Sequence, residues 1–176
     1  HVVDDALHGS DAVATSLVLA EALKKLEWDV VITGMASTDG TMSVVPAMLA
    51  ERLGVPGLTL AGNLAIDGTT VTIRRDSDDA STTITAELPA LVSVTDQTGE
   101  ARYPSFKGIM AAKKKPVETV SIADAGLDAA RVGLGAAATA VVDFAARPPK
   151  AAGVTVTDEG DGGVKIADFL SENKFI

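Results

Sequence analysis

The sequence VVITGMASTDGTMSVVP, from Val30 to Pro46, predicts a strand, a polar loop and the beginning of a helix. Val30 to Thr33 are β-formers, the run breaks at Gly34, and a helical pattern begins near Met42. A glycine-containing loop that leads into a helix suits a phosphate, because the free N–H groups and the dipole of a helix N-terminus attract anions. An ordinary capped turn between a strand and a helix fits the same residues, since the loop matches neither GxGxxG nor a Walker A sequence.

Composition predicts a globular α/β protein with an aliphatic core. Of the 176 residues, 47% are hydrophobic and only 3% are aromatic, so Ala, Val, Leu and Ile must fill the core. The net charge of −9 argues against a nucleic-acid or anionic-membrane surface, which needs clustered Lys and Arg. The lack of cysteine excludes disulfides, thiolate nucleophiles and Cys-ligated metals, and two histidines near the start leave no His-based triad. No apolar run approaches the roughly 18 residues of a membrane span, so we expect a soluble, cytoplasmic protein without membrane insertion.

The segments around the opening stretch predict half of a doubly wound unit. Apolar residues at three- and four-residue steps predict an amphipathic helix from Ser10 to Glu27, and a second helix is expected from about Met42 to Leu53. In such units, ligands bind beyond the carboxyl ends of the parallel strands. We therefore expect a three-layer α/β fold with a mainly parallel sheet of the adenine-nucleotide-binding type.

The following segments predict further strands. Alternating β-formers from Leu58 to Ile66 and from Thr70 to Arg75, joined by Asp67-Gly68, predict an antiparallel hairpin. After the hairpin we expect strands at 82–87, 90–94 and 117–122, and a weak helix at about 135–145.

The final residues predict an arm with little core of its own. Arg147, Pro148, Pro149 and Lys150 mark an extended linker, and after a polar, glycine-rich segment a small amphipathic helix is expected at 164–170. We therefore divide the chain into an α/β domain, residues 1–146, and a C-terminal arm, residues 147–176.

The stretch RYPSFKGIMAAKKK, from Arg102 to Lys115, combines aromatic, apolar and basic residues. Its lysines complement the dipole of a short helix, which is sufficient reason for their position. Exposed aromatic and methionine side chains are also frequent at interfaces, so the same stretch fits a docking surface.

Four stretches, taken together and in order, resemble the β subunit of electron-transfer flavoproteins. They are TGMASTDGTMSVVP at 33–46, IRRDSDDASTTITAELPALVSV at 73–94, ARYPSFKGIMAAKKK at 101–115 and RPPKAAGVTVTDEG at 147–160. The resemblance implies an electron carrier without catalytic residues of its own, paired as a heterodimer with an α subunit that holds most of the FAD. It further implies that acyl-CoA dehydrogenases, as in fatty acid oxidation, reduce the FAD, that a membrane quinone oxidoreductase accepts the electrons, and that the β subunit binds AMP structurally.

The resemblance also assigns roles to residues of this chain. The AMP-binding loop would be Gly34, Met35, Ala36, Ser37, Thr38, Asp39, Gly40, Thr41, Met42, Ser43, Val44 and Val45, with Asp39 and Gly40 at the phosphate turn. Asp76 would face the flavin and an arginine of the α subunit, where relatives have Glu. The partner-docking loop would comprise Arg102, Tyr103, Pro104, Ser105, Phe106, Lys107, Gly108, Ile109, Met110, Lys113, Lys114 and Lys115, with Phe106 in place of an anchoring Leu. The arm from Arg147 would embrace the α subunit.

Two alternatives and one difference accompany these expectations. Some members of the family hold a second FAD in place of AMP and bifurcate electrons. A stress-type regulator that binds ATP through Thr38, Asp39 and Gly40, without a flavin partner, fits the same loop. Family members begin with a strand, a long helix and further strands that this chain lacks before His1, so we expect the biological protein to be longer.

Overall fold

The structure is a computed structural model that describes residues 1–150, 153 and 155–176. Two compact units are present, residues 1–140 and residues 141–176. The sequence places the boundary between the α/β domain and the arm at 146/147. The predicted arm includes Ala151, Ala152 and Val154, which lie outside the described residues.

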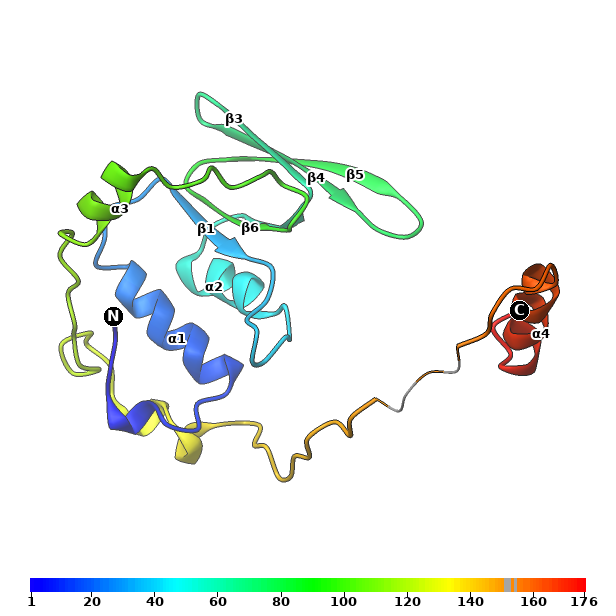
Figure 1. Ribbon diagram of the computed structural model, residues 1–176. Coiled ribbons are helices and arrows are strands. Elements are labelled where there is room, and N and C mark those ends of the chain that lie inside the picture. Colours follow the sequence, from blue (N-terminus) through cyan, green and yellow to red (C-terminus); the bar gives the residue numbers. More distant parts are fainter. Residues whose placement is uncertain (151–152, 154) are drawn as a thin grey trace. The chain divides into compact units, whose positions relative to one another are not determined.

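The centre of the first unit is a three-stranded parallel sheet in the order β1-β6-β2 (Figure 1). Its strands are β1 (Val30–Gly34), β2 (Gly57–Ala61) and β6 (Ala90–Val94). The middle strand β6 is buried on both faces, as expected for a strand with a neighbour on each side and a layer above and below. Ala90 and Val92 pack on one face of the sheet and Leu91 packs on the other, which is the period of two of a strand.

Two helices cover one face of this sheet, α1 (Ala12–Leu23) and α2 (Val45–Leu53) (Figure 1). The side chain of Asp11 caps α1 by accepting from the N–H of Ala14 at 3.0 Å. Helix α2 ends at Gly54, whose φ of 69° is the left-handed conformation that glycine adopts without strain. A core cluster lies between the helices and the sheet and comprises Ala20, Val31, Leu49, Ala50 and Leu91.

An antiparallel sheet in the order β3-β4-β5 covers the other face and forms the third layer (Figure 1). Its strands are β3 (Asn63–Asp67), β4 (Thr70–Asp76) and β5 (Ser81–Glu87). Apolar side chains of both sheets share a core cluster that comprises Leu58, Ala61, Val71, Ile73, Ala90 and Val92. The prediction of a three-layer, mainly parallel α/β fold with an antiparallel hairpin is therefore confirmed, and the hairpin is part of a three-stranded sheet.

The segment predicted as one strand from Leu58 to Ile66 is two strands in different sheets. Strand β2 ends at Ala61 and β3 begins at Asn63, so the chain changes sheet at Gly62. The N–H of Gly62 donates to the carbonyl of Arg74 at 2.8 Å, which starts the antiparallel pairing. The prediction of a single strand was wrong because β2 and β3 have the same alternating pattern of side chains, so the pattern does not mark the point at which the chain moves from one sheet to the other.

Helices α1 and α2 are both shorter than predicted. Helix α2 begins at Val45 instead of Met42, because Thr41 and Ser43 have φ values of 48° and 56°, which no helix allows. Helix α1 occupies Ala12–Leu23 of the predicted span from Ser10 to Glu27, and Leu26, an apolar residue of that span, is 64% exposed.

Two weaker predictions were wrong. Residues 117–122 form no strand and contribute one isolated parallel bridge, between Val2 and Val120. In place of a helix at 135–145 there is a single 3-10 turn at Leu134–Ala136. The carboxylate of Asp11 accepts the N–H groups of Ala138 and Thr139, at 2.8 and 3.1 Å, so these donors are not available for helical bonds.

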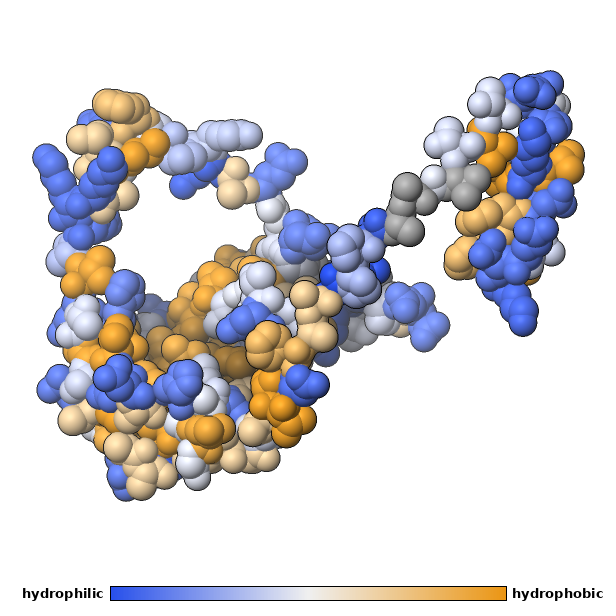
Figure 2. All heavy atoms as spheres, turned by 60° about the horizontal axis from the view of Figure 1, so that its bottom comes forward, coloured by the Kyte–Doolittle hydropathy of each residue, from blue (hydrophilic) through white to orange (hydrophobic). Residues whose placement is uncertain are grey.

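In the part of the second unit that the structure describes there is one helix, α4 (Gly162–Glu172), none of whose residues is buried. Figure 2 shows hydrophobic and hydrophilic side chains together on the surface of this unit, and Val164, Ile166 and Phe169 are more than half exposed. A shorter helix of the first unit, α3 (Phe106–Ala112), is also without buried residues. Among the described residues, no helix is long and apolar enough to cross a lipid bilayer.

Candidate functional site

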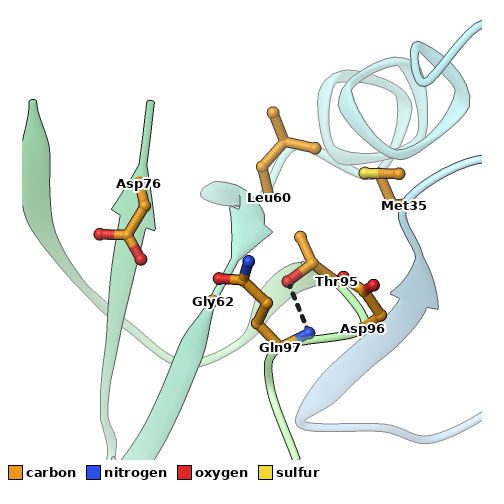
Figure 3. Close-up of a pocket in the computed structure, with 7 residues that line it drawn as sticks. All are labelled: Met35, Leu60, Gly62, Asp76, Thr95, Asp96 and Gln97. Atoms are coloured by element: carbon orange, nitrogen blue, oxygen red, sulfur yellow. Dashed lines mark hydrogen bonds between the residues drawn. The ribbon is translucent and has the colours of Figure 1, made fainter. Parts of the chain in front are cut away.

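A pocket of about 160 Å³ lies where β1, β2 and β6 end at their carboxyl termini. Open parallel sheets bind ligands at this edge, because the loops that follow neighbouring strands meet there. Figure 3 shows Met35 on one side of the pocket and Asp76 on the opposite side. The pocket is lined by Met35, Leu60, Gly62, Asp76, Thr95, Asp96 and Gln97.

Hydrogen bonds fix the turn after β6 against the end of β2. The N–H of Leu60, a residue with a φ of 61°, donates to the buried hydroxyl of Ser93 at 2.9 Å. The hydroxyls of Thr95 and Thr98 both donate to the carbonyl of Ala61, at 3.1 and 2.6 Å. The turn that carries Asp96 and Gln97 is thus held at both of its ends.

Asp76, at the end of β4, brings a carboxylate to the same pocket. Ser81 donates to Oδ1 of Asp76 at 2.5 Å, and Nε of Arg74 donates to Oδ2 at 3.1 Å. These two donors, first the Ser81 hydroxyl and then the Arg74 guanidinium, lower the pKa of Asp76. The carboxylate is therefore ionised at neutral pH.

The polar side chains that line the pocket mainly offer hydrogen-bond acceptors. Asp76 and Asp96 supply carboxylates and Gln97 supplies an amide, while Met35 and Leu60 supply apolar surface. None of the seven lining residues is Lys or Arg, so a phosphate would meet the carboxylates of Asp76 and Asp96, and the cation beside them, Arg74, is already paired with Asp76. The arrangement suits a flat group with N–H donors or a guanidinium.

In the polar loop after β1, the N–H of Gly40 is already hydrogen-bonded to side chains of the loop. The N–H of Gly40 donates to Oδ1 of Asp39 at 2.7 Å and to the hydroxyl of Ser37 at 3.3 Å. The side chain of Ser37 and the N–H of Gly40 lower the pKa of Asp39, so its carboxylate is ionised. Thr41 and Ser43 have a left-handed backbone, which is strained for residues with a Cβ and is frequent at ligand sites.

The beginning of α2, directly after this loop, has donors without a side-chain acceptor. Val44 occupies the N-cap position and makes no side-chain cap bond, and Pro46 in the first turn has no N–H. The hydroxyl of Thr33, near the end of β1, is inaccessible to solvent and has no hydrogen-bond partner among the described residues. An anion fits the start of α2 better than it fits Gly40, whose N–H is occupied by a neighbouring carboxylate.

The structure brings together some of the predicted site residues and separates others. Met35, of the predicted AMP-binding loop, and Asp76, the predicted flavin-facing residue, line one pocket. The predicted docking loop, residues 102–115, contributes no lining residue to it, and its Tyr103 and Phe106 are 100% and 80% exposed. Each of these assignments stays a prediction.

Five lining residues have no counterpart in the predicted site, namely Leu60, Gly62, Thr95, Asp96 and Gln97. A polar turn, Thr95 to Thr98, directly follows the buried strand β6 and was the available signal for three of them. Among the residues that the structure describes, no three His, Asp or Glu side chains are grouped so as to hold a metal ion.

Comparisons with known proteins agree with the resemblance seen in the sequence. The family model described as "Electron transfer flavoprotein domain" matches residues 1–125. "Electron transfer flavoprotein subunit beta" of Mycobacterium leprae is 45% identical over 177 residues, which cover 100% of this chain and 66% of the relative. The protein of the same name in Megasphaera elsdenii is 29% identical, over 96% of this chain and 65% of the relative. The one in Bacillus subtilis is 37% identical, over 72% of this chain and 49% of the relative. The chain thus spans 66% of the length of the mycobacterial relative.

Proposed function

The chain belongs to the electron transfer flavoprotein family, and from this premise we propose that it acts as the β subunit of an electron-carrying heterodimer whose α subunit holds most of the FAD. Membership of the family connects the chain with electron transfer by a flavin. The observation that carries the proposal is the pocket at the carboxyl edge of the parallel sheet, where Met35 and Asp76 converge. No acid, base or nucleophile of this chain is needed, because the flavin supplies the electron transfer when it is bound.

The residues of the pocket would position the flavin and the partner subunit. The apolar side chains of Met35 and Leu60 offer contact to a ring, and Asp76, Asp96 and Gln97 offer acceptors to N–H groups at its edge or to an arginine of the α subunit. A cavity of about 160 Å³ is smaller than the several hundred Å³ of usual ligand sites, so it accommodates a part of such a ligand. The remaining walls would come from outside these seven residues.

AMP would lie against the loop after β1, with its phosphate at the start of α2. The donors of the first turn of α2 and the positive end of its dipole favour an anion there, whereas the ionised Asp39 disfavours one at Gly40. This placement keeps the predicted loop, Gly34 to Val45, and moves the phosphate from its centre to its end.

The exposed segment 102–115 would dock the partners that exchange electrons with the flavin. It carries five cations and no acid in a chain of net charge −9, so an acidic partner surface would be steered to it. Phe106, the first residue of α3, would enter an apolar slot of the partner, because its side chain is 80% exposed. We propose acyl-CoA and related dehydrogenases as donors and a membrane-associated quinone oxidoreductase as acceptor.

The second unit would serve as an arm that packs on the α subunit. Helix α4 has an amphipathic pattern but no buried residue, so its apolar side chains are available to a partner surface. A cytoplasmic location completes the proposal.

Mass spectrometry of the nucleotides released from the native complex tests the proposal. We expect a yellow heterodimer that releases one FAD and one AMP. Release of two FAD per heterodimer and no AMP would mean that a second flavin occupies the AMP site, as in the electron-bifurcating type. A colourless complex that releases only ATP would contradict the electron carrier and favour the regulator.

A further inference from the structure

The carboxylate of Asp76 is clamped by two side chains of the same antiparallel sheet. Ser81 lies directly opposite Asp76 in the pairing of β4 with β5, and Arg74 precedes Asp76 by two residues on β4. Residues at these positions share one face of a sheet, which is why all three side chains meet. Ser81 bonds one carboxylate oxygen at 2.5 Å and Arg74 bonds the other at 3.1 Å, so the carboxylate cannot rotate without losing a bond.

The clamp directs the carboxylate to the pocket and leaves that side open. Gly62 lies beside it, and a Cβ at this position would be 3.1 Å from Oδ2 of Asp76 and 3.7 Å from Oε1 of Gln97. The missing side chain therefore keeps the space in which the carboxylate of Asp76 and the amide of Gln97 border the pocket (Figure 3).

The clamp contributes little to stability. The side chains of Arg74 and Asp76 are 55% and 32% exposed, and ion pairs at such positions are screened by water and salt. The backbone pairing of Asp76 with Ser81 also holds this hairpin closed, independently of the side chains. The remaining effect of these two hydrogen bonds is to fix the position of the Asp76 carboxylate.

We propose that Arg74 and Ser81 are positioning residues that hold the negative charge of Asp76 toward the flavin, and that this charge lowers the midpoint potential of the bound flavin. The inference rests on the proposed function, because it needs a flavin at the pocket. A fixed carboxylate disfavours added electron density nearby, since like charges repel most strongly at short distance and low dielectric. Without the clamp the carboxylate samples other rotamers and its mean distance from the flavin increases.

Redox titration of the purified heterodimer tests the inference. Asp76→Asn is expected to raise the midpoint potential, and Ser81→Ala to raise it by a smaller amount without any change of formal charge. Ser81→Thr retains the hydroxyl and is expected to restore the original potential. Thr83→Ala removes a hydroxyl two residues further along the same strand, from a residue paired with Arg74, and serves as the matched control with no shift.

The dependence of the potential on pH gives a second readout that a merely structural role would not move. Loss of the Ser81 hydroxyl removes the largest cause of the lowered pKa of Asp76, so the acidic inflection in the pH profile is expected at higher pH in Ser81→Ala. Arg74→Lys keeps the positive charge, loses the Nε donor and is expected to shift the potential in the same direction as Ser81→Ala.

The failures of this inference and of the proposed function are distinguishable. A heterodimer that contains FAD, in which Ser81→Ala and Arg74→Lys leave both the potential and its pH profile unchanged, overturns the inference alone. An unchanged potential in Asp76→Asn overturns it as well, because the charge then does not act on the flavin. A heterodimer without FAD overturns the proposed function and this inference together.

Discussion

The sheet body, residues 1–140, and the second unit, residues 141–176, differ in where their apolar side chains lie. In the body, Leu58, Leu91 and Val92 are at most 1% exposed, at the boundaries between three layers. In the second unit, Val164, Ile166 and Phe169 are 65%, 62% and 57% exposed, although their helix is well formed. A helical pattern alone therefore does not supply a core, and the two units should respond differently to loss of an apolar side chain.

The largest effect is expected from Leu91→Ala, in the middle strand of the parallel sheet. The side chain is 0% exposed, so the substitution leaves a cavity and should lower the free energy of unfolding by about 2–5 kcal/mol. Urea denaturation followed by circular dichroism measures the loss. Ile166→Ala in the second unit is the control, and an equal loss there would remove the distinction between the two units.

A smaller effect is expected from Ser16→Ala, which tests how α1 and α2 are joined. The fully buried hydroxyl of Ser16 accepts from Nε of Arg52 at 2.9 Å and donates to the carbonyl of Val13 at 2.9 Å. Loss of the hydroxyl should cost about 1 kcal/mol, because Arg52 keeps its bond to Val13 and loses the other. Thermal melts of both proteins give the difference, and an unchanged melting temperature would show that the hydroxyl is dispensable.

Acid should destabilise the body by weakening exposed hydrogen bonds. Neighbouring N–H and hydroxyl donors lower the pKa of five body carboxyls, those of Asp11, Asp39, Asp76, Glu87 and Asp124. When folding lowers the pKa of a carboxyl, its hydrogen bonds stabilise the folded state fully above the pKa of the unfolded chain, which is about 4. This contribution is lost as the pH falls through the pKa of the folded state. Denaturation midpoints between pH 7 and pH 2 should therefore fall only below about pH 4. Glu87→Gln, which loses the ionised acceptor of Thr69 and Thr70, should flatten this fall, and an unaltered slope would contradict the assignment.

Removal of the residues after Arg147 should leave the body as stable as before and weaken its association with the α subunit. The truncation removes α4, none of whose residues is buried. Unfolding of the truncated chain and its binding to the α subunit, measured by calorimetry, separate the two effects. Undiminished affinity would show that the second unit is not the arm we propose.

The smallest effect on stability is expected from Phe106→Ala, since the side chain is 80% exposed. If the segment 102–115 docks the electron donors, this variant should slow reduction of the flavin by a partner dehydrogenase while the flavin content stays the same. Ile66→Ala, at a 46% exposed residue of β3 outside this segment, is a control for general loss of apolar surface. An unchanged rate in Phe106→Ala would exclude Phe106 from docking.

The sequence by itself determined the local elements and the direction of the main strands. The β-formers before Gly34 and the helical spacing after it gave β1 and α2, and Asp67-Gly68 gave the turn between β3 and β4, where Gly68 has a φ of 58°. Such features depend on neighbouring residues, whose side-chain period and backbone preferences act over a few positions. Met35 and Asp76 were also accessible from sequence, through family resemblance.

Only the tertiary structure decided which distant segments meet. The change of sheet at Gly62 depends on a hydrogen bond to Arg74, and the pocket at the carboxyl edge depends on β6 lying between β1 and β2. The non-helical course after Ala136 depends on Asp11, which takes donors from residues more than 120 positions away. These contacts follow from the packing of whole layers, which no local pattern of residues reports.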